Sequence, residues 1–181
     1  MRYALILALL MIGGCGEPET GAETHGSNAA GAEGGLSVYF SPQTDCRQLI
    51  ISHIKLARKS ISVQAYSFNS DSIAKALVEA HKRGVKVTVI LDAEKAERPS
   101  KTEGDYLAKR SVDVFIDPKH EKAHSKIIII DGETVITGSF NFADESTEQV
   151  ADNLLVLTGK PKISAAYVES FERHLAHSTR M

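Results

Sequence analysis

A histidine, a lysine, a serine and an asparagine recur at short intervals in the most apolar part of this chain. The segment AHSKIIIIDGETVITGSFNF, residues 123–142, carries His124 and Lys126 before four isoleucines, and Ser139 and Asn141 after a second β-rich run. An imidazole can act as nucleophile or acid, an ammonium carries a fixed positive charge, and hydroxyl and carboxamide groups donate neutral hydrogen bonds. Together these groups suit an anionic phosphoryl ligand.

The same segment predicts a β-hairpin, because Asp131-Gly132 separates two β-rich runs. A two-residue turn would pair residue 130 with 133, and a four-residue loop would pair 130 with 135. Side chains alternate between the faces of a strand. Either register would therefore place the four polar side chains on one face, provided that no bulge intervenes.

Chance is a poor explanation of the whole pattern. A His-x-Lys pair on a strand would by itself be ordinary surface decoration. The joint pattern H-x-K-x4-D-x6-G-S-x-N has a chance probability of roughly one in a million in a chain of this length. We therefore treat the set as functional, with Gly138 allowing the backbone to approach a ligand closely.

The segment from His124 to Asn141 resembles the HKD motif of the phospholipase D superfamily, and is most similar to small bacterial endonucleases that carry one motif per chain. A second stretch, SVQAYSFNSDSIAKALVEAHKRGVKVTVILD (62–92), is similar to the first β-α-β unit of those enzymes. The resemblance covers most of residues 36–177. Its motif is specific for the superfamily and much less specific for the substrate.

The resemblance implies a hydrolase of phosphoric diesters. His124 would attack phosphorus to form a phosphohistidine, and a histidine from a second motif would protonate the leaving oxygen. Because this chain has one motif, the second would come from a twin chain, in a homodimer with the site on its two-fold axis. Lys126, Ser139 and Asn141 would bind the phosphate, while Asp131, at the turn, would be structural. One imidazole must be neutral and the other charged, which implies a bell-shaped dependence of rate on pH.

An acidic residue completes the motif in this family. It is usually a glutamate about eleven positions after the asparagine, and it orients the nucleophilic histidine. Asp152 occupies that position and is one methylene shorter, which leaves its hydrogen bond to His124 open. Glu148 is an alternative partner or a solvated loop carboxylate, and Val150 stands where the similar nucleases have a polar residue.

Neither a cofactor nor a metal is expected. Lysines would supply the charge stabilisation, and no group of carboxylates resembles a Mg²⁺ site. Four histidines outside the motif lack the spacing of metal ligands and are predicted to lie at the surface, namely His81, His120, His174 and His177.

The N-terminus predicts export. A cationic start, Met1-Arg2, precedes an apolar run, residues 3–12, that is too short to span a bilayer as a mature helix. Gly13-Gly14 then lead to Cys15, and IGGC resembles a bacterial lipobox whose cysteine is acylated. Residues 1–15 are thus expected to be a lipoprotein signal peptide, with ordinary cleavage nearby or an uncleaved anchor as alternatives. The expected location is the cell envelope, with the outer membrane or periplasm favoured.

Residues 16–35 contain no aliphatic side chain larger than alanine, and this composition predicts a flexible tether. The catalytic domain is expected to span 36–177. If Cys15 is acylated, Cys46 is the remaining thiol of the chain, and we expect it to be a small buried residue. A Cys15–Cys46 disulfide is the alternative.

Alternating β and α patterns predict an α-β-α sandwich, a mixed sheet flanked by helices. Besides the hairpin, the predicted strands are 36–40, 60–68, 85–92, 112–116 and 153–159, the helices lie at about 44–58, 71–83, 102–110 and 161–176, and 93–101 is a loop.

Composition leaves the substrate open. The net charge of −2 does not indicate a nucleic-acid binder, although residues 47–86 hold eight basic side chains against two acidic ones. That basic stretch faces either solvent or a polyanion. The leading hypothesis is an endonuclease acting on DNA or RNA. The alternatives are a phospholipase D that converts phosphatidylcholine to phosphatidate, and a non-catalytic phosphate-binding lipoprotein.

Overall fold

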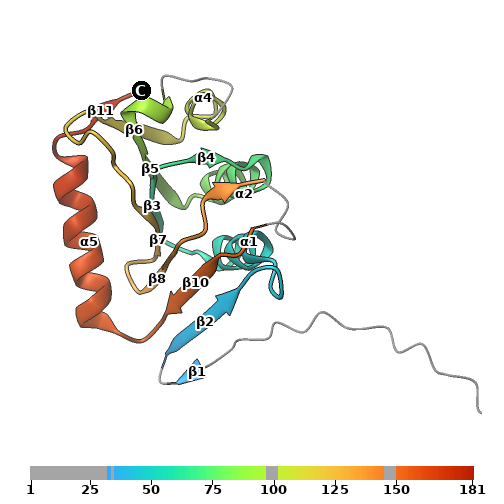
Figure 1. Ribbon diagram of the computed structural model, residues 1–181. Coiled ribbons are helices and arrows are strands. Elements are labelled where there is room, and N and C mark those ends of the chain that lie inside the picture. Colours follow the sequence, from blue (N-terminus) through green and yellow to red (C-terminus); the bar gives the residue numbers. More distant parts are fainter. Residues whose placement is uncertain (1–31, 34, 97–101, 145–149) are drawn as a thin grey trace, which may run out of the picture.

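The computed structural model describes residues 32–33, 35–96, 102–144 and 150–181, which fold as a mixed β-sheet between helices (Figure 1). The main sheet has the strand order β1-β2-β10-β8-β7-β3-β5-β6-β11. Strands β3, β5 and β6 are parallel to one another, and the other neighbouring strands are antiparallel. Its strands are β1 (Ala32–Glu33), β2 (Leu36–Phe40), β3 (Ser60–Ala65), β5 (Lys86–Asp92), β6 (Asp113–Asp117), β7 (Lys126–Ile130), β8 (Thr134–Gly138), β10 (Asn153–Leu157) and β11 (Thr179–Arg180).

Helices cover both faces of this sheet (Figure 1). On one face lie α1 (Cys46–Leu56) and α2 (Asp71–Lys82), and on the other lies α5 (Pro161–Leu175). Asp45 caps α1 by accepting from the Gln48 amide, and Ser70 caps α2 by accepting from the Ile73 amide. The remaining elements are the short helices α3 (Ala93–Ala96) and α4 (Gly104–Ala108), and a two-stranded parallel sheet of β4 (Phe68–Asn69) and β9 (Phe142–Ala143).

The isoleucine run of β7 explains why the hairpin sequence is so apolar. Ile128 and Ile130 pack into the core beneath α1 and α2, whereas Ile129 packs with Phe171 of α5 on the opposite face. A strand that is covered on both faces has no solvent side and reads as a continuous apolar run. The predicted α-β-α sandwich is therefore confirmed.

Several element boundaries differ from the predictions. The stretch predicted as one strand at 60–68 is divided into β3 and β4, and residues 93–96 form helix α3 rather than loop. At the C-terminus, β11 pairs with β6 beyond the expected domain end at 177. Within the predicted tether, 32–33 pairs with β2. The predicted signal peptide with Cys15, and Glu148, lie outside the described residues. Within the described ranges, no helix has the length and apolar character needed to cross a membrane.

Candidate active site

His124 and Lys126 lie where the chain enters β7. His124 stands two residues before the strand and is exposed, whereas Lys126 opens the strand and is only 9% exposed. The Lys126 Nζ atom lies 3.4 Å from His124 Nδ1 and donates to the His124 carbonyl oxygen, also at 3.4 Å. A largely buried ammonium thus stands beside an imidazole that solvent can reach, as an anionic ligand would require.

Asp152 acts on Lys126 through its charge. Burial lowers the pKa of the Lys126 ammonium, because the charged form loses hydration. The Asp152 carboxylate opposes this effect and raises the same pKa. Asp152 makes no hydrogen bond to His124 among the contacts of the described residues. Its Oδ1 atom instead accepts a 2.7 Å hydrogen bond from Ser139 Oγ.

Three neighbouring segments fix the position of Asp152. Ser139 lies just after β8, and its Oγ also accepts from the Asn153 amide at 3.0 Å. Ser41, next to β2, accepts from the Asp152 amide at 2.8 Å and donates to the Val150 carbonyl oxygen at 2.7 Å. The ends of β2, β8 and β10 therefore converge on one carboxylate, which is linked through its charge to Lys126.

The backbone around His124 is held on both sides. Asp92, at the end of β5 and fully buried, accepts the Ala123 amide at 2.7 Å, and the Tyr66 amide donates to the Ser125 carbonyl oxygen at 3.0 Å. The Tyr66 ring lies 4.2 Å from the His124 ring, centroid to centroid. Sequence reasoning missed Tyr66, although its place just past a strand of the parallel part of the sheet is where ligands bind in such sheets.

The hairpin has neither of the two registers considered from the sequence. Ile130 pairs with Thr134 and Ile127 pairs with Thr137, which leaves a three-residue turn at 131–133. Continued regularly, this register would set Lys126 beside Gly138 and turn Ser139 to the other face. Both registers considered from the sequence are therefore wrong, and a regular ladder would not place Ser139 on the face of Lys126. Ser139 is linked to Lys126 through Asp152 because the chain leaves the ladder after Gly138.

The turn itself explains this register. Asp131 and Gly132 have φ values of 56° and 71°, in the left-handed region. The Asp131 carboxylate accepts hydrogen bonds from three successive backbone amides, those of residues 58–60, at 2.7 to 3.2 Å. Asp131 is thus structural, and it sits at the end of β7 opposite to Lys126.

Gly138 allows a close approach between strands, while the approach to a ligand expected from the sequence stays a prediction. A Cβ atom at this position would collide with the carbonyl oxygen of Asn153, at the start of β10. The short distance between these backbones is what allows Ser139 to bond to both Asn153 and Asp152.

Asn141 is the one predicted site residue that no contact joins to the others within the described residues. It lies between β8 and β9, and its Oδ1 atom is buried without a hydrogen-bond partner. The Nε2 atom of Gln64, in β3, is in the same condition. Buried polar atoms are normally paired, so both are candidates for bonding to something outside this chain.

Cys46 takes no part in this chemistry. It is fully buried at the start of α1, as the sequence predicted. Burial, with smaller effects from the Asp152 and Asp45 carboxylates, raises its pKa to about 11. A thiol with so high a pKa is protonated at neutral pH and a poor nucleophile.

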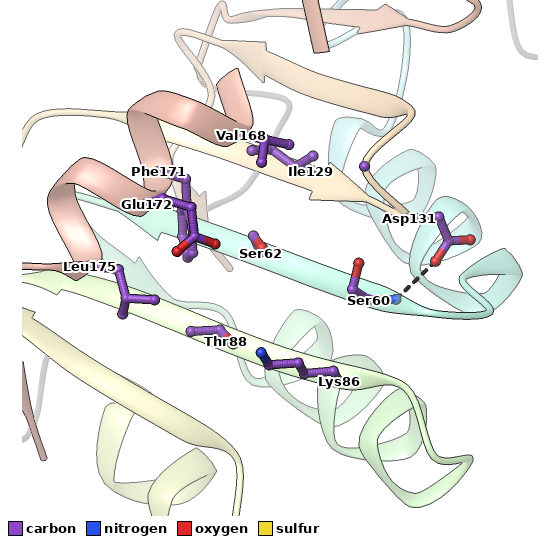
Figure 2. A pocket seen from close by; sticks show the side chains of 11 residues that line it. Ser60, Ser62, Lys86, Thr88, Ile129, Asp131, Val168, Phe171, Glu172 and Leu175 are labelled. Carbon is purple, nitrogen blue, oxygen red and sulfur yellow. Dashed lines mark hydrogen bonds between the residues drawn. The ribbon is translucent and has the colours of Figure 1, made fainter. Parts of the chain in front are cut away.

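A hollow of about 260 Å³ lies elsewhere, between α5 and the sheet (Figure 2). Ser60, Ser62 and Thr88 line it from the strands, and Phe171 and Leu175 line it from the helix. None of His124, Lys126, Ser139, Asn141 and Asp152 borders this hollow. This hollow is therefore not part of the predicted site.

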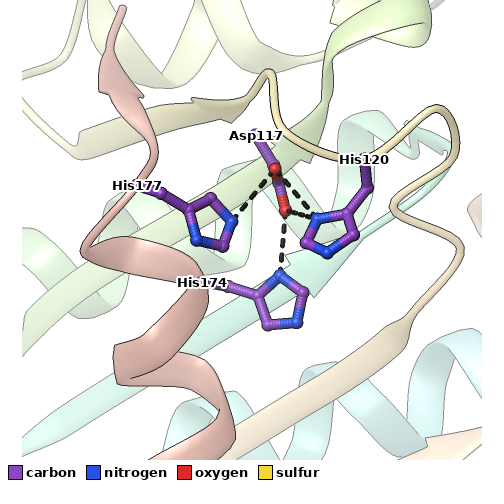
Figure 3. A group of neighbouring side chains, drawn as sticks. All are labelled: Asp117, His120, His174 and His177. Atoms are coloured by element: carbon purple, nitrogen blue, oxygen red, sulfur yellow. Dashed lines mark hydrogen bonds and ion pairs between the residues drawn. The ribbon is translucent and has the colours of Figure 1, made fainter.

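The histidines outside the motif correct another expectation. Three of them surround Asp117 (Figure 3), namely His120, His174 and His177. His120 is exposed and His174 and His177 are partly exposed, so the prediction that they lie at the surface holds. Their spacing in the sequence was a poor guide to a ligand set, because the pairing of the C-terminal segment with β6 brings distant parts of the sequence together. His81 is not in the group.

A family model described as "Cardiolipin synthase, PLD-like domain" matches residues 50–175. A protein named phospholipase D from Rickettsia prowazekii is 35% identical over 136 residues, which cover 75% of this chain and 65% of that protein. A mitochondrial cardiolipin hydrolase from Xenopus laevis is 33% identical over 117 residues, 65% of this chain and 55% of that protein. The chain thus spans about two thirds of the first relative and about half of the second.

Among solved structures, the fold is similar to a crystal structure of a phospholipase D family member, Nuc, from Salmonella typhimurium. The TM-score is 0.75 at 33% sequence identity, and the match covers 81% of this chain and 97% of that one. The homologues are hydrolases of phosphodiester bonds. The sheet with its flanking helices and the family model over more than half of the chain agree, and the chain belongs to the phospholipase D-like family.

Proposed function

We propose that this protein is a metal-independent phosphodiesterase in which His124 forms a phosphohistidine, that two chains share one active site, and that the substrate is DNA or RNA. The observation that carries the proposal is the exposed His124 imidazole with the Lys126 ammonium 3.4 Å from its Nδ1 atom. One group supplies a nucleophile, and the other supplies the positive charge that a phosphoryl oxygen needs.

The reaction has two displacements. In the first, a His124 imidazole nitrogen bonds to phosphorus while the phosphorus–oxygen bond to the leaving group breaks, and the partner's His124 gives its proton to the leaving oxygen. In the second, water bonds to phosphorus, the nitrogen–phosphorus bond breaks, and the partner's His124 takes the water proton. Lys126 from each chain would bind the non-bridging oxygens, so the residues supply the charge without a metal ion.

The single chain offers half of this machinery, which supports a homodimer. It carries one copy of the motif and has two large apolar side chains exposed beside Asp152. These are Phe40, 46% exposed and paired in register with Asn153, and Val150, 38% exposed. Exposed apolar groups next to an incomplete polar site are typical of an interface.

Two observations favour a nucleic-acid substrate. The chain carries one motif, as do the small bacterial endonucleases that it resembles, and its match to the Nuc structure covers 97% of that chain. A second candidate, a phospholipase D, is favoured by the names of the rickettsial and Xenopus relatives. We also propose the lipid anchor at Cys15 and a cell-envelope location. An anchor of this kind would suit either substrate.

The substrates are separated by assaying the full chain on plasmid DNA, on RNA and on phosphatidylcholine liposomes. We expect nicking or degradation of nucleic acid, with a rate that falls steeply as salt screens the phosphate contacts. Release of choline without nucleic-acid cleavage would instead establish the phospholipase.

The catalytic role is tested with His124→Ala, for which we expect a loss of roughly 10³-fold or more in rate. His81→Ala, outside the site, is the matched control. A ³²P-labelled substrate should label the wild type at histidine and leave His124→Ala unlabelled. Full activity in His124→Ala would overturn the mechanism, and phosphate binding without turnover would leave the non-catalytic lipoprotein.

A further inference from the structure

Four side chains from two distant parts of the chain meet at one end of the sheet (Figure 3). We call them the Asp117 cluster. Asp117 ends β6 and is fully buried, His120 lies in the loop after it, and His174 and His177 lie in and just beyond the last turn of α5. The three imidazole centroids are 4.9 to 5.3 Å apart, so the rings form a nearly equilateral triangle around the carboxylate.

One nitrogen of each ring is directed at the carboxylate. His174 Nδ1 lies 2.9 Å from Oδ2 of Asp117, His120 Nδ1 lies 3.0 Å from the same atom, and His177 Nε2 lies 3.2 Å from Oδ1. All four donor atoms lie within 4.8 Å of one another. The edge of a tetrahedral zinc site with bonds of about 2.1 Å is about 3.4 Å. The distances from the ring nitrogens to the Asp117 oxygens are already close to that edge. The widest separation between donor atoms would have to shorten by on the order of 1 Å.

The composition of the cluster is also that of a metal site. Three neutral imidazole nitrogens and one carboxylate oxygen form a closed four-ligand set for zinc. A purely hydrogen-bonded cluster would need each ring to donate an N–H to Asp117. The buried Nε2 atom of His177 points to the carboxylate but makes no well-formed hydrogen bond within the described residues. A lone pair directed at a cation accounts for that orientation.

We propose that the Asp117 cluster binds a divalent transition-metal ion of the zinc type. The ion stabilises the fold and takes no part in the chemistry at His124. It would join the C-terminal end of α5 to β6 and to the loop 118–125, which leads directly into His124. This inference goes beyond the proposed function and does not depend on it.

Metal content is the direct test. The full chain, made without a polyhistidine tag, is loaded with zinc, dialysed and analysed for metal, and a parallel sample is loaded with cobalt. We expect one ion per chain, the intense visible absorption of tetrahedral cobalt, and a melting temperature that rises with zinc. His174→Ala and His177→Ala should each weaken zinc binding by roughly 10- to 100-fold or more, and the double variant should abolish it.

The control is His81→Ala, which removes a histidine outside the cluster and should bind the ion as the wild type does. A wild type that retains no zinc and gives no tetrahedral cobalt spectrum would overturn the proposal, leaving a hydrogen-bonded cluster. So would a double variant that retains the ion.

The two proposals fail separately. His124→Ala should keep the ion and lose phosphodiesterase activity, whereas the double histidine variant should lose the ion and still form phosphohistidine below its own melting temperature. If EDTA abolished activity without lowering the melting temperature, metal-independent catalysis would be contradicted. That result would not contradict the proposed metal site at the Asp117 cluster.

Discussion

At the scale of single residues, the site depends on how one ammonium is kept charged. Lys126 is 9% exposed, and burial lowers its pKa, while the Asp152 carboxylate raises it. Asp152 is in turn held by Ser139 and Ser41. The charge of Asp152 therefore favours the protonated form of Lys126. Ser139, which was expected to contact phosphate, also donates a hydrogen bond to Asp152.

This arrangement predicts a change in the alkaline limb of the rate profile. The acid imidazole sets the first alkaline limb of the bell-shaped profile. Lys126 must also be protonated to bind phosphate, so activity falls further as pH rises through the Lys126 pKa. In Asp152→Asn the amide oxygen can still accept from Ser139, but the charge that raises the Lys126 pKa is gone. We expect the further fall in kcat/KM that depends on Lys126 to shift to lower pH. Rates measured across the alkaline range would reveal this.

Asp71→Asn provides the comparison, because Asp71 is an exposed carboxylate that pairs with Lys75 on α2. Its profile should match that of the wild type. If the fall in kcat/KM that depends on Lys126 stays at the same pH in Asp152→Asn, then Asp152 does not support the charge of Lys126.

At the scale of elements, the β7–β8 hairpin depends on the carboxylate at its turn. Asp131 accepts the amides of residues 58–60 and so fixes the turn against the start of β3. Burial raises its pKa, but these amides, with a smaller effect from Lys59, outweigh burial and leave the pKa below its ordinary value. The ionised form is therefore the one that stabilises the fold.

The sign of the pH dependence follows. The stabilisation is complete above the unfolded-state pKa of about 3.9 and is lost as pH falls through the lower folded-state pKa. Asp131→Asn, which tolerates the same left-handed backbone, should lower the free energy of unfolding by about 1 kcal/mol at pH 7. The difference should vanish in acid, where wild-type Asp131 is also neutral. Urea denaturation over a pH series measures both values.

Glu133→Gln tests whether removing any charge at this turn lowers the free energy of unfolding. Glu133 is 77% exposed and lies 4.0 Å from Lys59, so its removal should change stability by less than about 0.5 kcal/mol. A loss in Asp131→Asn that persisted unchanged in acid would show that charge is not the cause.

At the scale of the whole molecule, the single chain carries one copy of the motif and exposes its His124 imidazole. The exposed Phe40 and Val150 border Asp152, and the described hollow beneath α5 lies elsewhere. A second chain placed over this surface would cover the apolar pair and supply the second imidazole. In that case the complete active site forms only in the dimer.

Mixing experiments examine this directly. When wild type and His124→Ala are unfolded together in equal amounts and refolded, random pairing leaves about one quarter of the dimers with two histidines. We expect activity near one quarter of that of the undiluted wild type at the same total concentration. Activity near one half would indicate that each chain works alone.

Interface variants add an independent measurement. Phe40→Ser and Val150→Ser should shift the protein toward monomer in analytical ultracentrifugation and reduce activity in parallel. Leu56→Ser is the matched control, because Leu56 is 73% exposed on α1 and forms no part of the site. A monomeric variant with full activity would refute the shared site.

The sequence by itself determined the family, the layered α/β fold and most elements, because apolar periodicity and a dense polar motif are local properties. It also identified His124 and Lys126 as neighbours, since residues two positions apart in the chain are close in any fold. It did not determine the register of the hairpin. That register depends on a three-residue turn which Asp131 fixes through amides about seventy positions earlier in the chain.

Only the tertiary structure decided which distant residues meet. Tyr66 lies against His124, Ser139 bonds to Asp152, and Gly138 accommodates the backbone of Asn153, through contacts between strands that no local pattern encodes. The Asp117 cluster joins residues more than fifty positions apart because β11 pairs with β6. Ligand spacing in a sequence detects sites built from one segment, whereas this group forms when the end of the last helix packs beside the end of a strand.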